Sequence, residues 1–163
     1  MFSTEQIITL RNTFRIVNKF MVFMWKIGMG RMINFWPAVV GRIMIIKHTG
    51  RKSGRTLYSP VNYAPVDGEI YCMAGFGTIT DWYRNLMANP CVEIWLPDRK
   101  VQVKAKDISD SPQRLRLIRE LLIASGFAAR MFGGIDPTKI DDSTLNKITS
   151  DYRIIYFIGE KTV

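Results

Sequence analysis

The sequence predicts an α+β fold, a mostly antiparallel split β-barrel of about six strands with flanking helices and an N-terminal amphipathic helix. Short β-like runs are joined by hairpin turns such as Asp67-Gly68. The runs do not alternate regularly with helices, as a parallel βαβ sheet requires. A GxGxxG sequence is also missing, which argues against a dinucleotide-binding domain.

The chain of 163 residues, 47% of them hydrophobic, is long enough for one domain with its own core. We expect residues 1–36 to contain a basic and apolar N-terminal helix. Residues 37–163 should form the barrel and its inserted helices. No linker or internal repeat divides them.

The N-terminal helix is expected over residues 4–33. Basic residues recur every four positions on one face, at Arg11, Arg15 and Lys19, and apolar residues occupy the other face. The apolar run over 20–25 is far shorter than the ~20 residues that a membrane-spanning helix needs. We expect this helix to pack on its own domain, and the alternative is that residues 1–33 lie on an anionic membrane surface. The predicted location is therefore the cytoplasm, with the inner face of the cell membrane as the alternative.

The remaining elements follow from local patterns. The second strand contains Pro60, which predicts an edge position or a bulge. Ser111 is the expected cap of an amphipathic helix. The expected strands are 42–47, 55–66, 70–74, 92–96, 101–105 and 152–158, and the expected helices after the first are 82–88 and 112–124.

The net charge of +9 lies in the first part of the chain. Ten Lys and Arg residues and no acidic residue occur between Gln6 and Val66, whereas thirteen basic and thirteen acidic residues balance from Asp67 onward. Such a localised positive field attracts nucleic acid, anionic lipid or a phosphorylated ligand. No nucleic-acid partner is expected, because bulky apolar residues interrupt the basic ones and no recognised nucleic-acid-binding sequence is present.

Cysteine and histidine are scarce. Cys72 and Cys91 lie in apolar runs and are expected to be buried free thiols in a reducing cytosol. His48 is the only histidine, so no metal site and no triad with a second imidazole is expected. A single Ser–His or Cys–His pair remains open.

Two segments carry most of the chemistry. The loop 49–55, Thr-Gly-Arg-Lys-Ser-Gly-Arg, contains Gly50 and Gly54, which allow it to turn its backbone N–H groups toward an anion, and it adds side-chain charge. Its simpler interpretation is a solvated basic hairpin loop. The segment 81–90, Asp-Trp-Tyr-Arg-Asn-Leu-Met-Ala-Asn-Pro, places flat rings beside polar donors and can wall a planar ligand. Alternatively, Trp82 and Leu86 simply fill the end of the barrel.

In this order and spacing, over about residues 43–96, the two segments resemble the deazaflavin-dependent nitroreductase and quinone reductase family. The resemblance implies a split barrel of the FMN-binding type and the coenzyme F420, an 8-hydroxy-5-deazaflavin with a phosphate link and a poly-glutamate tail. It also implies that Arg51, Lys52 and Ser53 bind the phosphate region. Leu57 stands where the family often has a basic residue, and Arg55 can replace it. The other implied cofactor-binding residues are Pro60, Val61, Asn62, Met73, Ala74, Gly75, Phe76, Asp81, Trp82, Tyr83, Arg84 and Asn85.

The implied reaction is hydride transfer from reduced F420 to a small-molecule acceptor, namely a quinone, a nitroaromatic or an enone-like compound. Tyr83 and Ser59 are the candidate proton donors, and a backbone N–H near Gly75 or Gly77 could stabilise the acceptor. A substrate-side tyrosine of the family has only Phe127 or Phe132 as a counterpart. Two alternatives are an FMN-dependent barrel and a non-catalytic binder of lipid or fatty acid at the membrane. A homodimer is also considered.

Overall fold

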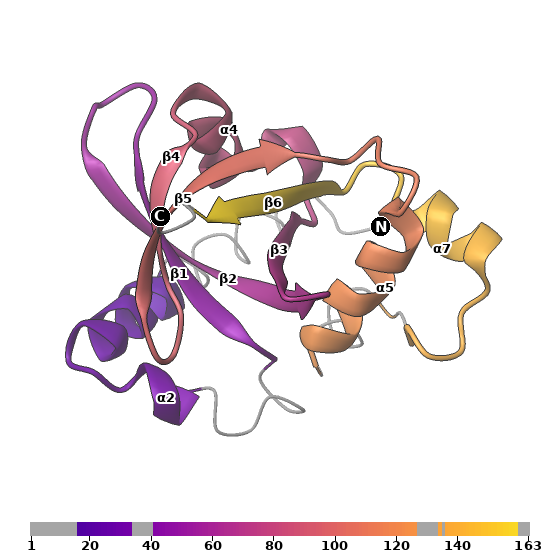
Figure 1. The fold of residues 1–163 in the computed structure, drawn as a ribbon, viewed down its shortest axis with the longest axis horizontal. Helices are drawn as coiled ribbons and strands as arrows, with labels where there is room; N and C mark the ends of the chain where they lie inside the picture. Colours follow the sequence, from indigo (N-terminus) through magenta and orange to yellow (C-terminus); the bar gives the residue numbers. More distant parts are fainter. Residues whose placement is uncertain (1–15, 34–40, 127–133, 135, 160–163) are drawn as a thin grey trace.

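The computed structural model describes residues 16–33, 41–126, 134 and 136–159. Six antiparallel strands close into a barrel in the order β1-β2-β3-β6-β5-β4 (Figure 1). The predicted α+β barrel class is therefore confirmed. The strands are β1 (Ile43–Thr49), β2 (Thr56–Val66), β3 (Glu69–Ala74), β4 (Cys91–Trp95), β5 (Lys100–Asp107) and β6 (Arg153–Gly159).

Helices cover the outside of the barrel and one of its ends (Figure 1). In the described N-terminal part, residues 16–26 are helical, and the short helix α2 (Gly30–Ile33) follows. No helix among the described residues is both long and apolar enough to cross a membrane. The remaining described helices are η1 (Gly77–Ile79), α4 (Asp81–Ala88), α5 (Arg114–Ala124) and α7 (Asp142–Ile148).

The barrel interior is filled by alternate residues of the strands. Met44 and Ile46 of β1 point inward and belong to one apolar cluster with Phe157 of β6. Leu86 of α4 is fully buried in the same cluster, and Trp82 is half-buried against it. Helix α4 therefore closes one end of the barrel, as the simpler interpretation of its sequence predicts.

Two further clusters lie outside the barrel wall. Helix α5 buries Leu117 and Ile118 against Ile154 of β6 and its neighbours. On the opposite side, Trp25 of the N-terminal helix packs on Ile45 and Trp95. The first four residues of β1, 43–46, are thus buried on both faces of the sheet, which explains their apolar sequence.

The N-terminal helix is interrupted, whereas one helix was predicted over 4–33. Residues 27–29 form a turn in which Gly28 adopts φ +86°. The N–H of Met29 donates to the carbonyl of Met24 at 3.0 Å, and the N–H of Gly28 donates to that of Trp25 at 3.1 Å. This pattern ends a helix at a left-handed glycine. The predicted residues 4–15 lie outside the described part of the chain, as do Phe127 and Phe132.

Three smaller expectations also have outcomes. The expected edge position or bulge at Pro60 is wrong, because β2 lies between β1 and β3 and its register with β1 is uninterrupted. Pairing with β3 begins only at Tyr63, so the missing N–H of the proline costs little. Helix α5 begins at Arg114 with Gln113 as its cap, not Ser111. Cys72 is buried, but Cys91 is exposed, because the inward positions of β4 belong to Val92 and Ile94.

Candidate active site

The basic loop between β1 and β2 is a tight hairpin that uses its own backbone donors. The N–H of Gly50 donates to the carbonyl of Arg55, and the N–H of Gly54 donates to that of Gly50, both at 2.8 Å. Gly54 has φ +65°, where a side chain would be strained. The N–H groups of Gly50 and Gly54 are therefore used to close the turn of the loop and are not available to a ligand.

The loop instead offers side-chain charge. Lys52 and Arg55 are exposed, and neither forms an ion pair with any described residue. Ser53 Oγ accepts a hydrogen bond from the N–H of Arg55 at 3.3 Å, which leaves the hydroxyl proton available. Two free cations beside a hydroxyl donor form a suitable environment for a phosphate.

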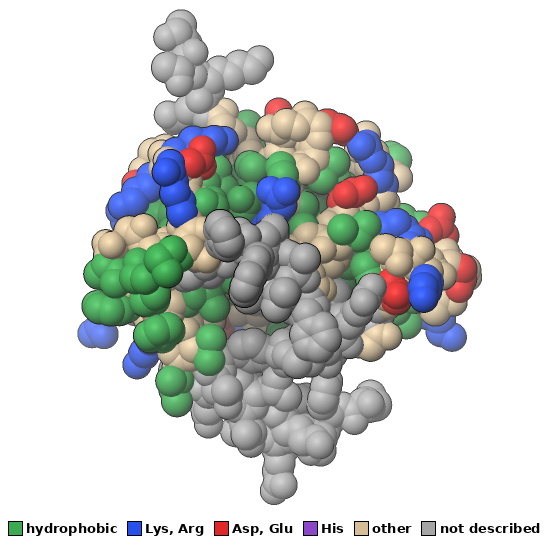
Figure 2. Space-filling view, turned by 90° about the horizontal axis from the view of Figure 1, so that it is seen from below, with side chains coloured by type: hydrophobic (Ala, Val, Ile, Leu, Met, Phe, Trp, Pro, Cys, Tyr) green, Lys and Arg blue, Asp and Glu red, His purple; other side chains and the backbone are tan. Residues whose placement is uncertain are grey.

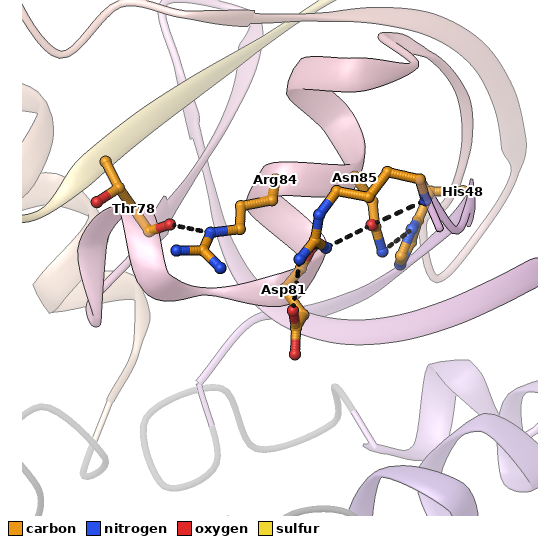
Figure 3. A network of polar contacts seen from close by, with 6 residues as sticks. His48, Thr78, Asp81, Arg84 and Asn85 are labelled. Carbon is orange, nitrogen blue, oxygen red and sulfur yellow. Dashed lines mark hydrogen bonds and ion pairs between the residues drawn. The ribbon is translucent and has the colours of Figure 1, made fainter. Parts of the chain in front are cut away.

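Arg51 fastens this loop to helix α4. Its Nη2 lies 3.2 Å from Asp81 Oδ1, and its Nη1 donates to Asn85 Oδ1 at 2.9 Å. The backbone N–H of Arg51 donates to the same Asn85 oxygen at 3.1 Å. The two segments that the sequence singled out separately are therefore in direct contact (Figure 3).

Behind Arg51, a polar group enters the barrel end. His48 is 4% exposed and follows Met44 and Ile46 on the inward face of β1. Its Nδ1 lies 3.4 Å from Asn85 Nδ2 (Figure 3). Its Nε2 lies 2.9 Å from Ser59 Oγ. Burial lowers the pKa of His48 to about 4, although the neighbouring backbone of Thr49 acts in the opposite direction. The imidazole is therefore neutral near pH 7.

His48 is the residue that reasoning from sequence missed. The signal was present in the two-residue period of β1, since Met44, Ile46 and His48 share one face. The Ser–His pair that the sequence left open exists, between Ser59 and His48.

Tyr83, the other predicted proton donor, is engaged elsewhere. It is buried, and its hydroxyl donates to Asp107 Oδ2 at 2.6 Å. Burial, together with the hydrogen bond to this carboxylate, raises the pKa of Tyr83 to about 12. Asp107 also accepts from the N–H and Oγ of Ser109. This arrangement joins α4 to the end of β5, and it favours a structural role for the Tyr83 hydroxyl.

The other predicted site residues divide into two groups. Val61 and Ala74 belong to the barrel interior, and Gly75 and Phe76 are exposed at the end of β3. Met73, in contrast, packs on the outer cluster under α5, because it alternates with Ala74. The side chains of the second group, Asn62 and Arg84, donate to backbone carbonyls. Asn62 Nδ2 donates to the Arg42 carbonyl at 3.2 Å, and Arg84 Nε donates to the Thr78 carbonyl at 2.7 Å.

Within the described residues, no cluster of His, Cys, Asp and Glu side chains could hold a metal ion. The side chains of Arg51, Lys52 and Arg55 can supply fixed charge, and Ser53 can supply a hydrogen-bond donor. These are the contributions that a protein makes when a bound organic cofactor carries the bond chemistry.

The chain matches the model of one known protein family. The model of the F420H(2)-dependent quinone reductase family matches residues 21–130. The search of curated proteins gave no match.

The solved structures that are similar to this one include the following three. A conserved hypothetical protein from Mycobacterium tuberculosis shares 16% identity over 74% of each chain, with a TM-score of 0.52. An F420-H2-dependent reductase shares 19% identity over 71% of this chain and 93% of its own, with a TM-score of 0.48. A chain described as a domain-swapped dimer shares 19% identity over 71% of this chain and 79% of its own, with a TM-score of 0.50.

Proposed function

Because the chain belongs to the F420H2-dependent quinone reductase family and is thus an F420-dependent oxidoreductase, we propose that it transfers a hydride to a quinone, nitroaromatic or enone-like acceptor. Bound F420H2 would supply the hydride from its deazaflavin ring. The protein would supply position and electrostatics, since the reaction needs no nucleophilic side chain.

One observation carries the proposal: Arg51 joins the basic loop to helix α4. The anionic part of F420 would lie against Arg51, Lys52, Ser53 and Arg55, where two cations lack carboxylate partners among the described residues. Its ring would then extend toward the side of α4 that carries Trp82 and Asn85. The free cations therefore fit the charge of this cofactor.

For protonation of the acceptor we favour Ser59 over Tyr83. The Ser59 side chain is half-buried and hydrogen-bonded only through a neutral imidazole in the described structure. The Tyr83 proton, in contrast, is engaged by Asp107 Oδ2 and is not available to an acceptor.

Fluorescence titration with F420 and, separately, with FMN tests the cofactor. We expect micromolar or tighter F420 binding that the Lys52→Ala/Arg55→Ala double variant weakens strongly. A preference for FMN would keep the fold and change the cofactor. Binding of neither ligand would refute the reductase function for this site and favour the lipid-binder alternative.

A second proposal concerns the membrane surface. The described N-terminal helical region exposes large apolar side chains, and Figure 2 shows such side chains gathered beside Lys and Arg on one face. The exposed apolar residues are Ile16, Val17, Phe20, Phe23, Ile27 and Met32, and the exposed cations among them are Lys19, Lys26 and Arg31. Apolar residues flanked by cations favour peripheral contact with an anionic bilayer, where a quinone would also reside.

Sedimentation with phosphatidylglycerol-containing vesicles tests this contact. We expect binding that Phe20→Ser/Phe23→Ser and 0.5 M salt each reduce, while F420 affinity is retained. Binding that ignores both changes would contradict the contact. Gel filtration with light scattering tests the homodimer, for which the similar domain-swapped chain is the only support.

A further inference from the structure

A continuous series of hydrogen bonds runs from the basic loop into the barrel end. Two donors of Arg51, its backbone N–H and its Nη1, meet the same side-chain oxygen of Asn85 at 3.1 and 2.9 Å. Neither donor can accept a hydrogen bond, so the amide oxygen must face Arg51. The amide nitrogen of Asn85 then faces His48.

This orientation decides which nitrogen of His48 carries the proton. Asn85 Nδ2 is a donor and lies 3.4 Å from His48 Nδ1, so Nδ1 must accept and carry no proton. In the neutral ring the single proton is then on Nε2. Burial of the ring, which is 4% exposed, keeps it neutral.

The proton on His48 Nε2 determines how the Ser59 hydroxyl forms hydrogen bonds. His48 Nε2 lies 2.9 Å from Ser59 Oγ, and with its proton it must donate. The Ser59 oxygen therefore accepts, and its own proton must point elsewhere. In the parts of the chain that the structure describes, no acceptor receives that proton.

We propose that His48 is a positioning residue whose Nε2–H, fixed by Asn85, turns the Ser59 hydroxyl into a hydrogen-bond donor toward an oxygen of the bound ligand. The ligand role rests on the proposed function. The same geometry excludes a Ser–His nucleophile, because an Nε2 that already holds a proton cannot remove one from Ser59. Since Arg51 belongs to the loop that would hold the phosphate, the anion-binding end and the donor end of the site share one network.

Because the chain has a single histidine, the position of the proton on the His48 ring can be measured directly. Long-range 1H–15N NMR of the full untagged chain, labelled with 15N-histidine, reports the protonated ring nitrogen without assignment. We expect the neutral Nε2–H form at pH 7 in the ligand-free protein. In Asn85→Asp a carboxylate oxygen faces Nδ1 and accepts, so the proton should move to Nδ1 and the pKa of His48 should rise.

Asn146→Asp is the matched control. Asn146 Oδ1 also accepts from a guanidinium, Arg114 Nη1 at 3.1 Å, but it lies on α7, away from His48. It should leave the histidine signals unchanged. A proton on Nδ1 in the wild-type protein would overturn the proposal, and so would an Asn85→Asp variant that retains the Nε2–H form.

Ser59→Ala tests the second part of the proposal, the hydrogen bond from the Ser59 hydroxyl to the ligand. We expect F420 affinity or the rate of reduction of a soluble naphthoquinone to fall about fivefold or more, with the Nε2–H signal retained. Unchanged binding and turnover would overturn the donor role. If the wild-type chain binds no F420, both the proposed function and the hydrogen bond from Ser59 to the ligand are refuted. The protonated nitrogen of His48 is still decided by the NMR measurement alone.

Discussion

Lys52→Ala and Arg51→Ala each remove one cation from the same loop, but the two cations have different surroundings. Lys52 is exposed and unpaired with any described residue. The Arg51 side chain is 22% exposed and contacts Asp81 and Asn85. The two substitutions should therefore have similar effects on F420 binding and different effects on stability.

The expected magnitudes follow from these contacts. The ion pair with Asp81, whose side chain is 66% exposed, contributes about 0.5 kcal/mol. The guanidinium hydrogen bond to buried Asn85 adds about 1 kcal/mol, and Asn85 keeps the backbone N–H of residue 51 as a donor. Arg51→Ala should thus lower the free energy of unfolding by about 1.5 kcal/mol and Tm by about 3–6 °C. Lys52→Ala should change stability by less than about 0.5 kcal/mol.

The second quantity that these substitutions should change is the Kd for F420. Loss of one exposed cation from a phosphate site costs about 1 kcal/mol, or about a fivefold increase in Kd. F420 fluorescence titration and thermal unfolding by circular dichroism, measured on the same samples, give both quantities.

Arg116→Ala is the control, because it breaks an ion pair with Asp67 at 3.0 Å between α5 and the β2–β3 turn. It should leave the F420 Kd unchanged. A Lys52→Ala variant that lowers Tm as much as Arg51→Ala, or that leaves the Kd for F420 unchanged, would contradict these expected effects.

Three more outcomes are expected. Gly77→Ala should lower the free energy of unfolding by about 2 kcal/mol or more, since φ is +60° and a Cβ would lie 2.4 Å from the carbonyl of residue 151; Gly75→Ala, whose nearest contact is 3.9 Å, should not. Tyr83→Phe should cost about 1–2 kcal/mol in urea unfolding at pH 7 through the lost bond to Asp107, and turnover should stay within threefold; a much larger loss of turnover would restore Tyr83 as the proton donor. Because the pKa of His48 falls from 6.5 to about 4, the unfolded chain binds a proton that the folded protein does not, so stability declines as pH drops through this window; His48→Gln should flatten the decline by roughly 3 kcal/mol, and an unchanged slope would contradict the burial argument.

The local parts of this structure could be predicted from the sequence. The Asp67-Gly68 turn, the apolar run of β1 and the tight loop around Gly54 depend on neighbouring residues and on their backbone preferences. The two chemistry-bearing segments stood out for the same reason, because each concentrates its charge or its aromatic rings within a few positions.

The contacts between distant segments could not be predicted. Ser59 meets His48 because β1 and β2 pair with His48 opposite Leu57, which places Ser59 diagonally on the same inward face. A register shifted by one residue would have moved Ser59 to the other side of the sheet. The position of α4 over the barrel end then brings Asn85 to both His48 and Arg51.

The directions in which side chains point explain the remaining differences between the predicted and the observed surroundings of single residues. Cys91 and Met73 lie in apolar runs, yet each faces the outside of the barrel, because its neighbour takes the inward position. The Tyr83 hydroxyl reaches Asp107, which lies 24 positions away in the sequence. The sequence by itself determined the strands, the turns and the two segments that form the site. Only the tertiary structure decided which polar groups meet, since strand register and helix placement are set by burial over the whole barrel.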